Sequence, residues 1–475
     1  MIALYLVFSF LIAAGLFVNR KKSMVFYLTG AFLVLQWVLI LYACFHFRNT
    51  EYTYFTYDAL GLLLLMALGV VSLPAFIHSH IYLEDQAASP SSRAIYYASM
   101  VLLVTAIGAG YLANHIAVTW IFTEITTLSA SALIYHHRNK LALEGTWKYV
   151  FICAISITFV FIGILFLSLA LVHAGSDDLS YQNLLLNSSK LNVFWLRLAF
   201  IFIFTGFTAK LGLVPMFTAG IDAKDKAPAP AAALLASVLM NLGFVGIFRF
   251  YVVISNSSLH EWANLVIGIA AFLTLFVAAV YMIKVKNIKR MFAYSGIEHM
   301  GLVMLAVAAG GIGYYAAILH IILHVFVKSS LFFQFTQLYR VFQDKNIYHI
   351  GNYFKYNPTG AMVLLLGFVS ATAMPPSGLF VSEFMIFRAL FEGGRPGLLV
   401  VVLILLTMII WAFGRNIFKI LFVPPIGFHD QKVPKISPWE SSSQFVLLFA
   451  AMYLGLNPPQ AFVRLIQESI LNIPF

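Results

Sequence analysis

Long apolar stretches constrain the fold of this chain more than any other feature of its sequence. A membrane-spanning helix needs about 20 apolar residues, because lipid offers no partner to an unpaired backbone hydrogen-bonding group. We expect spans near residues 1–18, 24–45, 57–78, 96–113, 115–135, 148–172, 194–217, 228–251, 262–283, 294–310, 314–339, 360–391, 397–423 and 441–466. The sequence therefore predicts an all-α polytopic membrane protein with about 14 transmembrane helices.

Composition excludes a water-soluble globular protein. Hydrophobic residues make up 61% of the 475 residues and charged residues 10%, whereas soluble domains carry about 25% charged residues. Cys44 and Cys153 lie on separate apolar stretches, so neither a disulfide framework nor a thiolate-held metal cluster is expected. We therefore predict that the chain binds no cofactor and no metal of its own.

The distribution of basic residues predicts the orientation in the membrane. Of 29 Lys and Arg residues, twenty lie in or next to loops after odd-numbered spans and seven in or next to the other loops and the tail; Lys210 and Lys328 are assigned to the interior of spans. Cytoplasmic loops retain Lys and Arg. We expect both termini to face away from the cytoplasm in the cell inner (plasma) membrane. The net charge of +11 is thereby explained as a topology signal, and no nucleic-acid partner is expected.

Several ionisable residues fall inside predicted spans, where each costs a few kcal/mol or more unless it has a partner or a function. They are Glu124, Lys210, Glu298, His299, His320, His324, Lys328 and Glu383. Positions 320, 324 and 328 are spaced i, i+4, i+8 and thus share one helix face. A lone histidine in such a helix is more often a hydrogen-bonded core residue, but three titratable groups in register favour a proton ladder. No transport role is expected for the loop residue His173.

Two helix breakers lie next to two of these charges. Pro215 follows Lys210 by five residues, and Pro375 and Pro376 precede Glu383. Broken membrane helices mark transport sites in inverted-repeat transporters, although each break alone is compatible with a packing kink. The five-span separation of the breaks favours two inverted five-helix repeats. We expect the repeats at 96–251 and 262–423, flanked by N-terminal helices (1–95) and by a C-terminal loop with a last helix (424–475).

Glu124 admits two interpretations. As a protonated carboxyl it would donate an interhelical hydrogen bond. Paired with Lys210, it would form a charge pair whose opening releases a proton. We favour the pair.

Four segments resemble the antiporter-like subunits shared by respiratory complex I, Mrp-type sodium/proton antiporters and membrane-bound hydrogenases. They are TEITTLSASALIYH with the following EGTWKYVFIC, then GFTAKLGLVPM, NIKRMFAYSGIEHMGL and MPPSGLFVSEFMIFRALF. The Glu-His pair in the third segment makes the resemblance strongest to the hydrogenase-4 component F type. The resemblance covers about residues 60 to 423.

The resemblance implies roles for the buried charges. Glu124 and Lys210 match the input pair of the family, and His320, His324 and Lys328 match its connecting axis. Glu383 matches the exit residue of the second broken helix, and His299 belongs to the hydrogenase-type Glu-His pair. Subunits of this family bind no flavin, quinone or metal.

One segment departs from the family. A His-x-Trp-Leu-Pro-Asp-Ala-His run normally follows the first broken helix, whereas residues 217–224 here read FTAGIDAK. Both histidines are absent, and Asp222 is retained. Whether the lost motif impairs pumping is open at this point.

The predicted function is proton translocation by a non-catalytic subunit of a larger complex, coupled to a redox partner such as a membrane-bound hydrogenase. Other membrane subunits and a peripheral, cytoplasmic protein are the expected partners. Three alternatives stay open: a stand-alone Mrp-like sodium/proton antiporter subunit, the membrane subunit of an inorganic-carbon uptake complex, and a scaffold that has lost transport. The sequence does not separate proton from sodium transport, and it does not give the oligomeric state.

Overall fold

The computed structural model describes residues 1–172, 174–426 and 434–474, and these are mostly helical. Within this part of the chain, eleven helices are long and apolar enough to cross a membrane, or up to 12 if the bent pair Pro438–Leu456 and Gln460–Ser469 is one span. Helices Ile2–Val18 and Pro358–Ala371 are apolar but shorter. The polytopic, all-α fold class is confirmed, whereas the predicted total of about 14 spans stays a prediction. His173 and Lys432, both expected in loops, lie outside the described residues.

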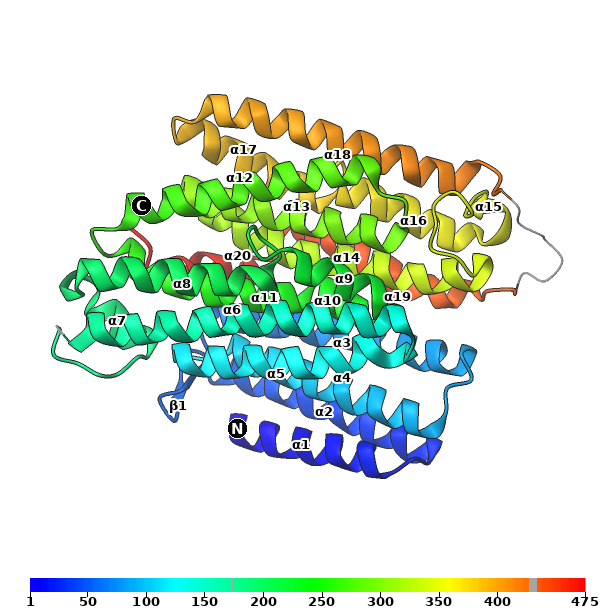
Figure 1. Cartoon of the computed structure of the whole chain (residues 1–475), viewed down its shortest axis with the longest axis horizontal. Helices are drawn as coiled ribbons and strands as arrows, with labels where there is room; N and C mark the ends of the chain where they lie inside the picture. Colours follow the sequence, from blue (N-terminus) through cyan, green and yellow to red (C-terminus); the bar gives the residue numbers. More distant parts are fainter. Residues whose placement is uncertain (173, 427–433, 475) are drawn as a thin grey trace. The chain divides into compact units, whose positions relative to one another are not determined.

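The elements follow one another in chain order (Figure 1). The first helices are α1 (Ile2–Val18), α2 (Lys22–Phe45), α3 (Ala59–Asp85), α4 (Pro90–Tyr111), α5 (Ile116–Ile134), α6 (Lys140–Val172), α7 (Tyr181–Leu186), α8 (Val193–Leu211), α9 (Thr218–Lys226), α10 (Ala229–Ala236) and α11 (Val238–Ser255). The later helices are α12 (His260–Lys284), α13 (Ile288–Ala309), α14 (Ile312–Phe342), α15 (Tyr353–Tyr356), α16 (Pro358–Ala371), α17 (Gly378–Glu392), α18 (Pro396–Phe422), α19 (Ser442–Leu456) and α20 (Gln460–Ser469). Two short strands, β1 (Thr50–Glu51) and β2 (Phe55–Thr56), pair antiparallel.

The described chain divides into two compact units, Met1–Ala231 with Val238–Val266 and Ala461–Phe475, and Ala232–Ser237 with Ile267–Gln460. In the first unit, α6 packs along α8 and against α5, and α4 packs against α1 and α5. Glycines allow α6 and α8 to approach closely, because a Cβ atom on Gly206 would lie 2.5 Å from the carbonyl oxygen of Ser156. Small residues at a helix crossing are typical of membrane proteins, where packing drives association.

The first predicted break lies between α8 and α9. Helix α8 ends at Leu211, and Gly212 caps it in the left-handed conformation with φ 89°. Pro215 lacks the backbone N–H that a continuing helix would need, and the chain becomes helical again at Thr218. The expected spans 194–217 and 228–251 leave Lys224 and Lys226 in a loop, whereas both lie in the short helix α9 and Lys224 is buried. Hydropathy assigns lysines to solvent, whereas α9 packs against α6 and α8.

In the second unit, α14 is the central helix and packs against α13, α16, α17 and α19. The apolar windows of α13 and α14 are fully buried. The predicted span 360–391 is interrupted, because α16 ends at Ala371 and α17 begins at Gly378. Ser377 caps α17 by accepting a hydrogen bond from the backbone N–H of Phe380, and Pro375 and Pro376 occupy the break.

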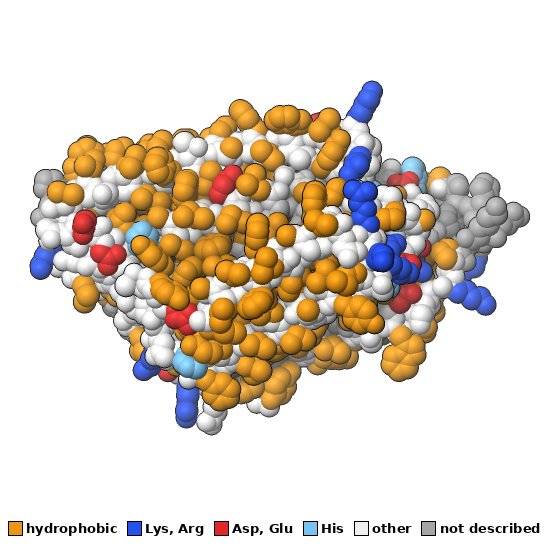
Figure 2. Space-filling view, turned by 90° about the horizontal axis from the view of Figure 1, so that it is seen from below, with side chains coloured by type: hydrophobic (Ala, Val, Ile, Leu, Met, Phe, Trp, Pro, Cys, Tyr) orange, Lys and Arg blue, Asp and Glu red, His pale blue; other side chains and the backbone are white. Residues whose placement is uncertain are grey.

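Peripheral helices have the composition expected of a lipid-facing surface. Less than half of the apolar window is buried in α2, α6, α12 and α18. Figure 2 shows one face of the chain, on which hydrophobic side chains cover most of the surface and few charged side chains interrupt them. Such an apolar surface is stable in a hydrocarbon environment and unstable in water.

Candidate functional site

Lys210 is buried at the C-terminal end of α8, directly before the break. Its Nζ atom donates to Oγ1 of Thr127 on α5 and to the hydroxyl of Tyr149 on α6, both at 2.9 Å. The ammonium group also lies 5.1 Å from the centre of the Tyr149 ring, within reach of a cation–π interaction. Three helices thus supply the groups that hold one buried cation.

Glu124 reaches this lysine through Thr127. Oε2 of Glu124 lies 3.3 Å from the Thr127 hydroxyl, one turn along α5. That hydroxyl has a single proton, for which Glu124 and the carbonyl oxygen of Thr123 compete at equal distances of 3.3 Å. Among the described residues, Glu124 and Lys210 make no direct ion pair. The predicted pair is therefore a hydroxyl-bridged arrangement.

A second group of titratable side chains lies where α13, α14 and α17 meet. Nδ1 of His299 lies 3.0 Å from Nε2 of His320 and 3.9 Å from Oε1 of Glu383. The other ring nitrogen of His320, Nδ1, lies 2.9 Å from Oγ of Ser382. The other nitrogen of His299, Nε2, lies 3.7 Å from Oε2 of Glu298. Both imidazoles are fully buried, and both carboxyls are largely so.

The Ser382 hydroxyl links the tautomers of the two histidines in their neutral forms. It has one proton, and the carbonyl oxygen of Leu379 and Nδ1 of His320 both lie 2.9 Å away. When the hydroxyl donates to Leu379, it accepts from Nδ1–H of His320. Nε2 of His320 then carries a lone pair and accepts from Nδ1–H of His299. This leaves the lone pair of His299 on Nε2, facing Glu298. The pair is a directed hydrogen-bond chain of the kind that passes protons.

The remaining two members of the predicted ladder extend along α14. The ring of His324 lies 5.2 Å from that of His299, centre to centre. Nζ of Lys328 donates to Oγ of Ser295 on α13 at 2.5 Å. All three ladder residues are fully buried, and α14 presents them toward α13. The structure thus brings His299, His320, His324 and Glu383 together, with Lys328 further along the same helix, and it places Glu124 with Lys210 in a separate cluster.

Hydroxyl groups are the components that sequence reasoning missed. Thr127, Tyr149, Ser295 and Ser382 each contact a predicted proton-transfer residue. A signal existed for Thr127, three residues after Glu124 and hence on the same helix face. Ser382 is adjacent to Glu383 in sequence. Nothing in the sequence distinguished Tyr149 from the other 22 tyrosines.

The segment that departs from the family holds a buried cation. Lys224 replaces the last histidine of the motif, and it is 2% exposed. Its Nζ atom lies 3.1 Å from Sδ of Met240 on α11. The neighbouring Asp225 and Lys226 form an ion pair at 2.9 Å. Charged groups therefore remain in this segment although both histidines are absent.

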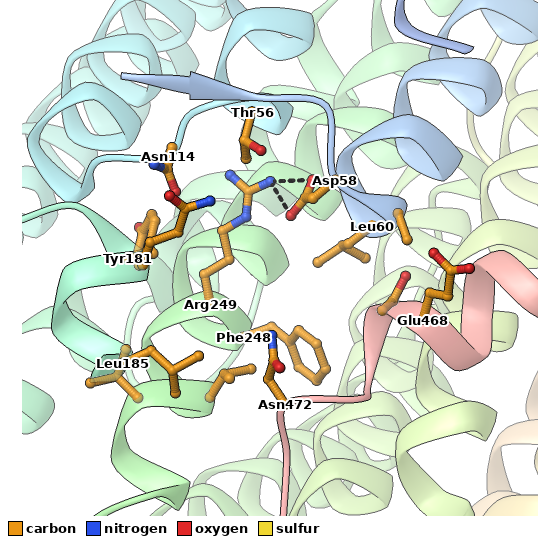
Figure 3. Close-up of a pocket in the computed structure, with 15 residues that line it drawn as sticks. Thr56, Asp58, Leu60, Asn114, Tyr181, Leu185, Phe248, Arg249, Glu468 and Asn472 are labelled. Atoms are coloured by element: carbon orange, nitrogen blue, oxygen red, sulfur yellow. Dashed lines mark hydrogen bonds and ion pairs between the residues drawn. The ribbon is translucent and has the colours of Figure 1, made fainter. Parts of the chain in front are cut away.

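Arg249 occupies the wall of a pocket of about 180 Å³ in the first unit (Figure 3). Its NH2 group lies 2.8 and 2.9 Å from the two carboxylate oxygens of Asp58, and it also donates to the carbonyl oxygen of Tyr111. NH1 donates to the carbonyl oxygen of Ala113. The guanidinium thus joins α3, the end of α4 and α11. Because NH1 and NH2 already have partners in the chain, these contacts favour a structural role for Arg249.

Comparison with known proteins assigns the family. Residues 113–409 match the family described as "NADH:quinone oxidoreductase/Mrp antiporter, TM". The chain belongs to this family. The matched range contains every predicted proton-transfer residue, from Glu124 to Glu383.

Similar proteins come from several kinds of complex. The Hydrogenase-4 component F homolog of Methylacidiphilum infernorum is 26% identical over 436 residues, which cover 90% of each chain. NADH-quinone oxidoreductase subunit N of Halorhodospira halophila is 26% identical over 384 residues, which cover 79% of this chain and 77% of the relative. A chain of the archaeal membrane-bound sulfane sulfur reductase has a TM-score of 0.85 at 20% identity, covering 99% of this chain and 96% of its own. A chain of the Mrp complex from Dietzia sp. DQ12-45-1b has a TM-score of 0.83 at 15% identity, covering 99% and 97%. These solved structures share the fold of this chain.

Proposed function

We propose that this chain is a proton-translocating, antiporter-like membrane subunit of a larger complex. The observation that carries the proposal is the buried Lys210, joined to Glu124 through the Thr127 hydroxyl next to a helix break. A buried cation is expensive in a membrane, so a lysine held there by two neutral hydroxyls has a function by default. Proton transfer is the function that these groups support best.

Each cluster has a distinct step in the proposed mechanism. When a partner's conformational change separates Glu124 from Lys210, the ammonium loses the nearby negative charge and releases its proton. The charge change is relayed to Lys328, His324 and His320. His299 then takes up a proton at Nε2 and passes its Nδ1 proton to Glu383, whose Oε1 lies 3.9 Å from that nitrogen. Glu383 is the residue from which it leaves.

The proposal also covers the helix repeats, the orientation in the membrane and the partner subunits. We propose two inverted five-helix repeats at 96–251 and 262–423, each with one broken helix, flanked by 1–95 and 424–475. Both termini face away from the cytoplasm of the cell inner membrane. The names of the relatives support a complex with other membrane subunits and a peripheral, redox-active partner such as a hydrogenase.

Proton uptake into liposomes tests the proposed function. The full chain, with the subunits that co-purify with it, is reconstituted around an internal pH dye, and a valinomycin-driven potassium potential drives uptake. We expect Lys210→Met and Glu124→Gln to abolish uptake without changing the co-purifying subunits. The matched control is Lys148→Met, because Lys148 is a half-exposed lysine on α6 paired with Glu144. Wild-type uptake by the Lys210→Met protein would overturn the proposal.

The same liposomes also distinguish proton translocation from sodium/proton exchange. An imposed sodium gradient without a potential produces proton movement only if the chain exchanges the two ions. We expect no such movement, because the clusters consist of imidazoles, an ammonium, carboxyls and hydroxyls that exchange protons. Sodium-driven alkalinisation that requires Glu383 would favour the Mrp-like exchanger instead.

A further inference from the structure

We propose that His299, His320 and Glu383 form a binding site for a divalent transition-metal cation, with Zn²⁺ as the best match. Their ligand atoms, one from each residue, all lie within 4.8 Å of one another. The three side chains come from three different helices, α13, α14 and α17. All three are buried, so they are held by packing and are not surface groups that meet by chance.

The distances are close to those of an occupied site. Zn²⁺ binds imidazole nitrogen and carboxylate oxygen at about 2.0–2.2 Å in a tetrahedron, which places two ligand atoms about 3.3 Å apart. The His299–His320 nitrogen distance is 3.0 Å, and the His299–Glu383 distance is 3.9 Å. The His320–Glu383 separation is at most 4.8 Å, so side-chain shifts of up to about 1.5 Å would bring Glu383 onto the ion. Two imidazoles and one carboxylate leave the fourth position for water.

His320 already has the outer partner that a metal ligand requires, and His299 has a carboxylate close to its second nitrogen. Metal-bound histidines donate their second N–H to a carboxylate, hydroxyl or carbonyl group, which orients the ring. Nδ1–H of His320 faces Ser382 at 2.9 Å, so its free lone pair on Nε2 points into the proposed site. Binding requires His299 in its other neutral tautomer, with the proton on Nε2. That nitrogen lies 3.7 Å from the Glu298 carboxylate, which accepts its hydrogen bond after a shift of about 0.7 Å.

Charge and ligand type decide which ion the site prefers. Glu298 and Glu383 together supply the two negative charges that balance a divalent cation in a buried position. Two imidazole ligands favour Zn²⁺ over Mg²⁺ and Ca²⁺, which prefer oxygen. Because the bound ion would occupy the lone pair of His320 and remove the His299–His320 hydrogen bond, it would also block proton transfer there. The block of proton transfer rests on the proposed function, whereas the binding of the ion does not.

Metal binding by the purified full chain tests the inference. The chain is isolated through a tag without histidines, stripped with a chelator, and titrated with Zn²⁺ alone and with Co²⁺ as a spectroscopic probe. We expect a tight site of about one ion per chain, with the intense visible absorption of tetrahedral Co²⁺. His320→Gln and Glu383→Gln should each lower the affinity of this site at least about 100-fold, and Ser382→Ala about 10- to 100-fold.

Two control variants make the test specific. His324→Gln removes a neighbouring buried imidazole that is not in the site, and His349→Gln removes an exposed imidazole beside Asp344. Both should retain the tight Co²⁺ spectrum. Equal affinity in wild-type and Glu383→Gln protein, or equal losses in His324→Gln and His320→Gln protein, would overturn the inference. Variants are compared only where gel filtration and thermal unfolding match the wild type.

The binding readout is independent of transport. A chain that binds Zn²⁺ but moves no protons would overturn the proposed function and keep this site. A chain that transports protons without binding Zn²⁺ would overturn the site and keep the function. If the chain both binds Zn²⁺ at this site and translocates protons, Zn²⁺ inhibits proton uptake, and a chelator restores the uptake.

Discussion

Nζ of Lys210 and Oγ1 of Thr127 lie 2.9 Å apart, and the same hydroxyl lies 3.3 Å from Oε2 of Glu124. The lysine and the glutamate thus communicate through a group that rotates about one bond. Because the Thr127 proton has a second acceptor in the carbonyl oxygen of Thr123, the link is made or broken by a small rotation. This arrangement suits a switch better than a direct ion pair, which would hold both charges firmly.

Replacing Thr127 by valine tests this link. Valine has nearly the same shape but no hydroxyl, so Lys210 loses one of its hydrogen bonds and its connection to Glu124. A hydrogen bond to a charged group contributes about 1.5–3 kcal/mol. We therefore expect proton uptake into liposomes to fall about tenfold or more.

Thr127→Ser is the control, because serine keeps the hydroxyl. It should retain most of the wild-type rate. Similar rates in the valine and serine proteins would show that the hydroxyl has no part in transport.

Replacing Lys328 by methionine should abolish proton uptake without lowering the thermal stability of the protein. Lys328 is fully buried and donates to Ser295. Methionine has a similar volume and no charge to desolvate, and burying an ammonium group in an apolar environment is costly. We expect uptake to be lost while the thermal unfolding temperature stays the same or rises.

Lys284→Met provides the matched control, since Lys284 is an exposed lysine at the end of α12. Its uptake should equal that of the wild type. Retained transport in the Lys328→Met protein would remove Lys328 from the proposed relay.

Adding a methyl group to Gly206 tests the close packing of α6 and α8. The new Cβ would lie 2.5 Å from the Ser156 carbonyl oxygen and 2.9 Å from the Val160 backbone nitrogen. These backbone atoms cannot move without separating the helices, and such overpacking costs about 1–3 kcal/mol. We expect Gly206→Ala to lower the thermal unfolding temperature of the solubilised protein. It should also slow uptake, because Tyr149 on α6 would move away from Lys210 on α8.

Gly30→Ala is the corresponding control on α2, where a Cβ atom would have no neighbour within 4 Å. Alanine also favours the helix slightly. Its unfolding temperature should equal or exceed that of the wild type. An equal decrease in both proteins would mean that the helix spacing at Gly206 is not restrictive.

Arg249→Lys tests whether the pocket of Figure 3 is structural. Lysine keeps the charge but not the planar group that bonds Asp58 and two backbone carbonyls together. We expect a loss of stability of about 1–3 kcal/mol, measured by thermal unfolding, with an unchanged uptake rate per folded protein. Lost uptake at unchanged stability would instead assign the pocket a part in transport.

Local hydrophobicity was sufficient to predict most of the helices that are long and apolar enough to cross a membrane. The span expected at 314–339 corresponds to α14, Ile312–Phe342, and the span expected at 397–423 corresponds to α18, Pro396–Phe422. Lipid imposes the same requirement on every residue of a span, so a window along the chain detects it. Prediction from local hydrophobicity failed where polar residues continue a helix. Helix α6 begins at Lys140 and not at residue 148, and Lys224 is buried in α9.

The sequence by itself determined that this is a helical membrane protein, where its helices break, and which buried residues carry charge. Spacing along one helix also placed His320, His324 and Lys328 on one face. Only the tertiary structure decided that Thr127 stands between Lys210 and Glu124, and that His299, His320 and Glu383 surround one point. The reason is physical: the cost of placing a residue in lipid depends on that residue alone, whereas a hydrogen bond depends on which helices pack together and how their side chains meet.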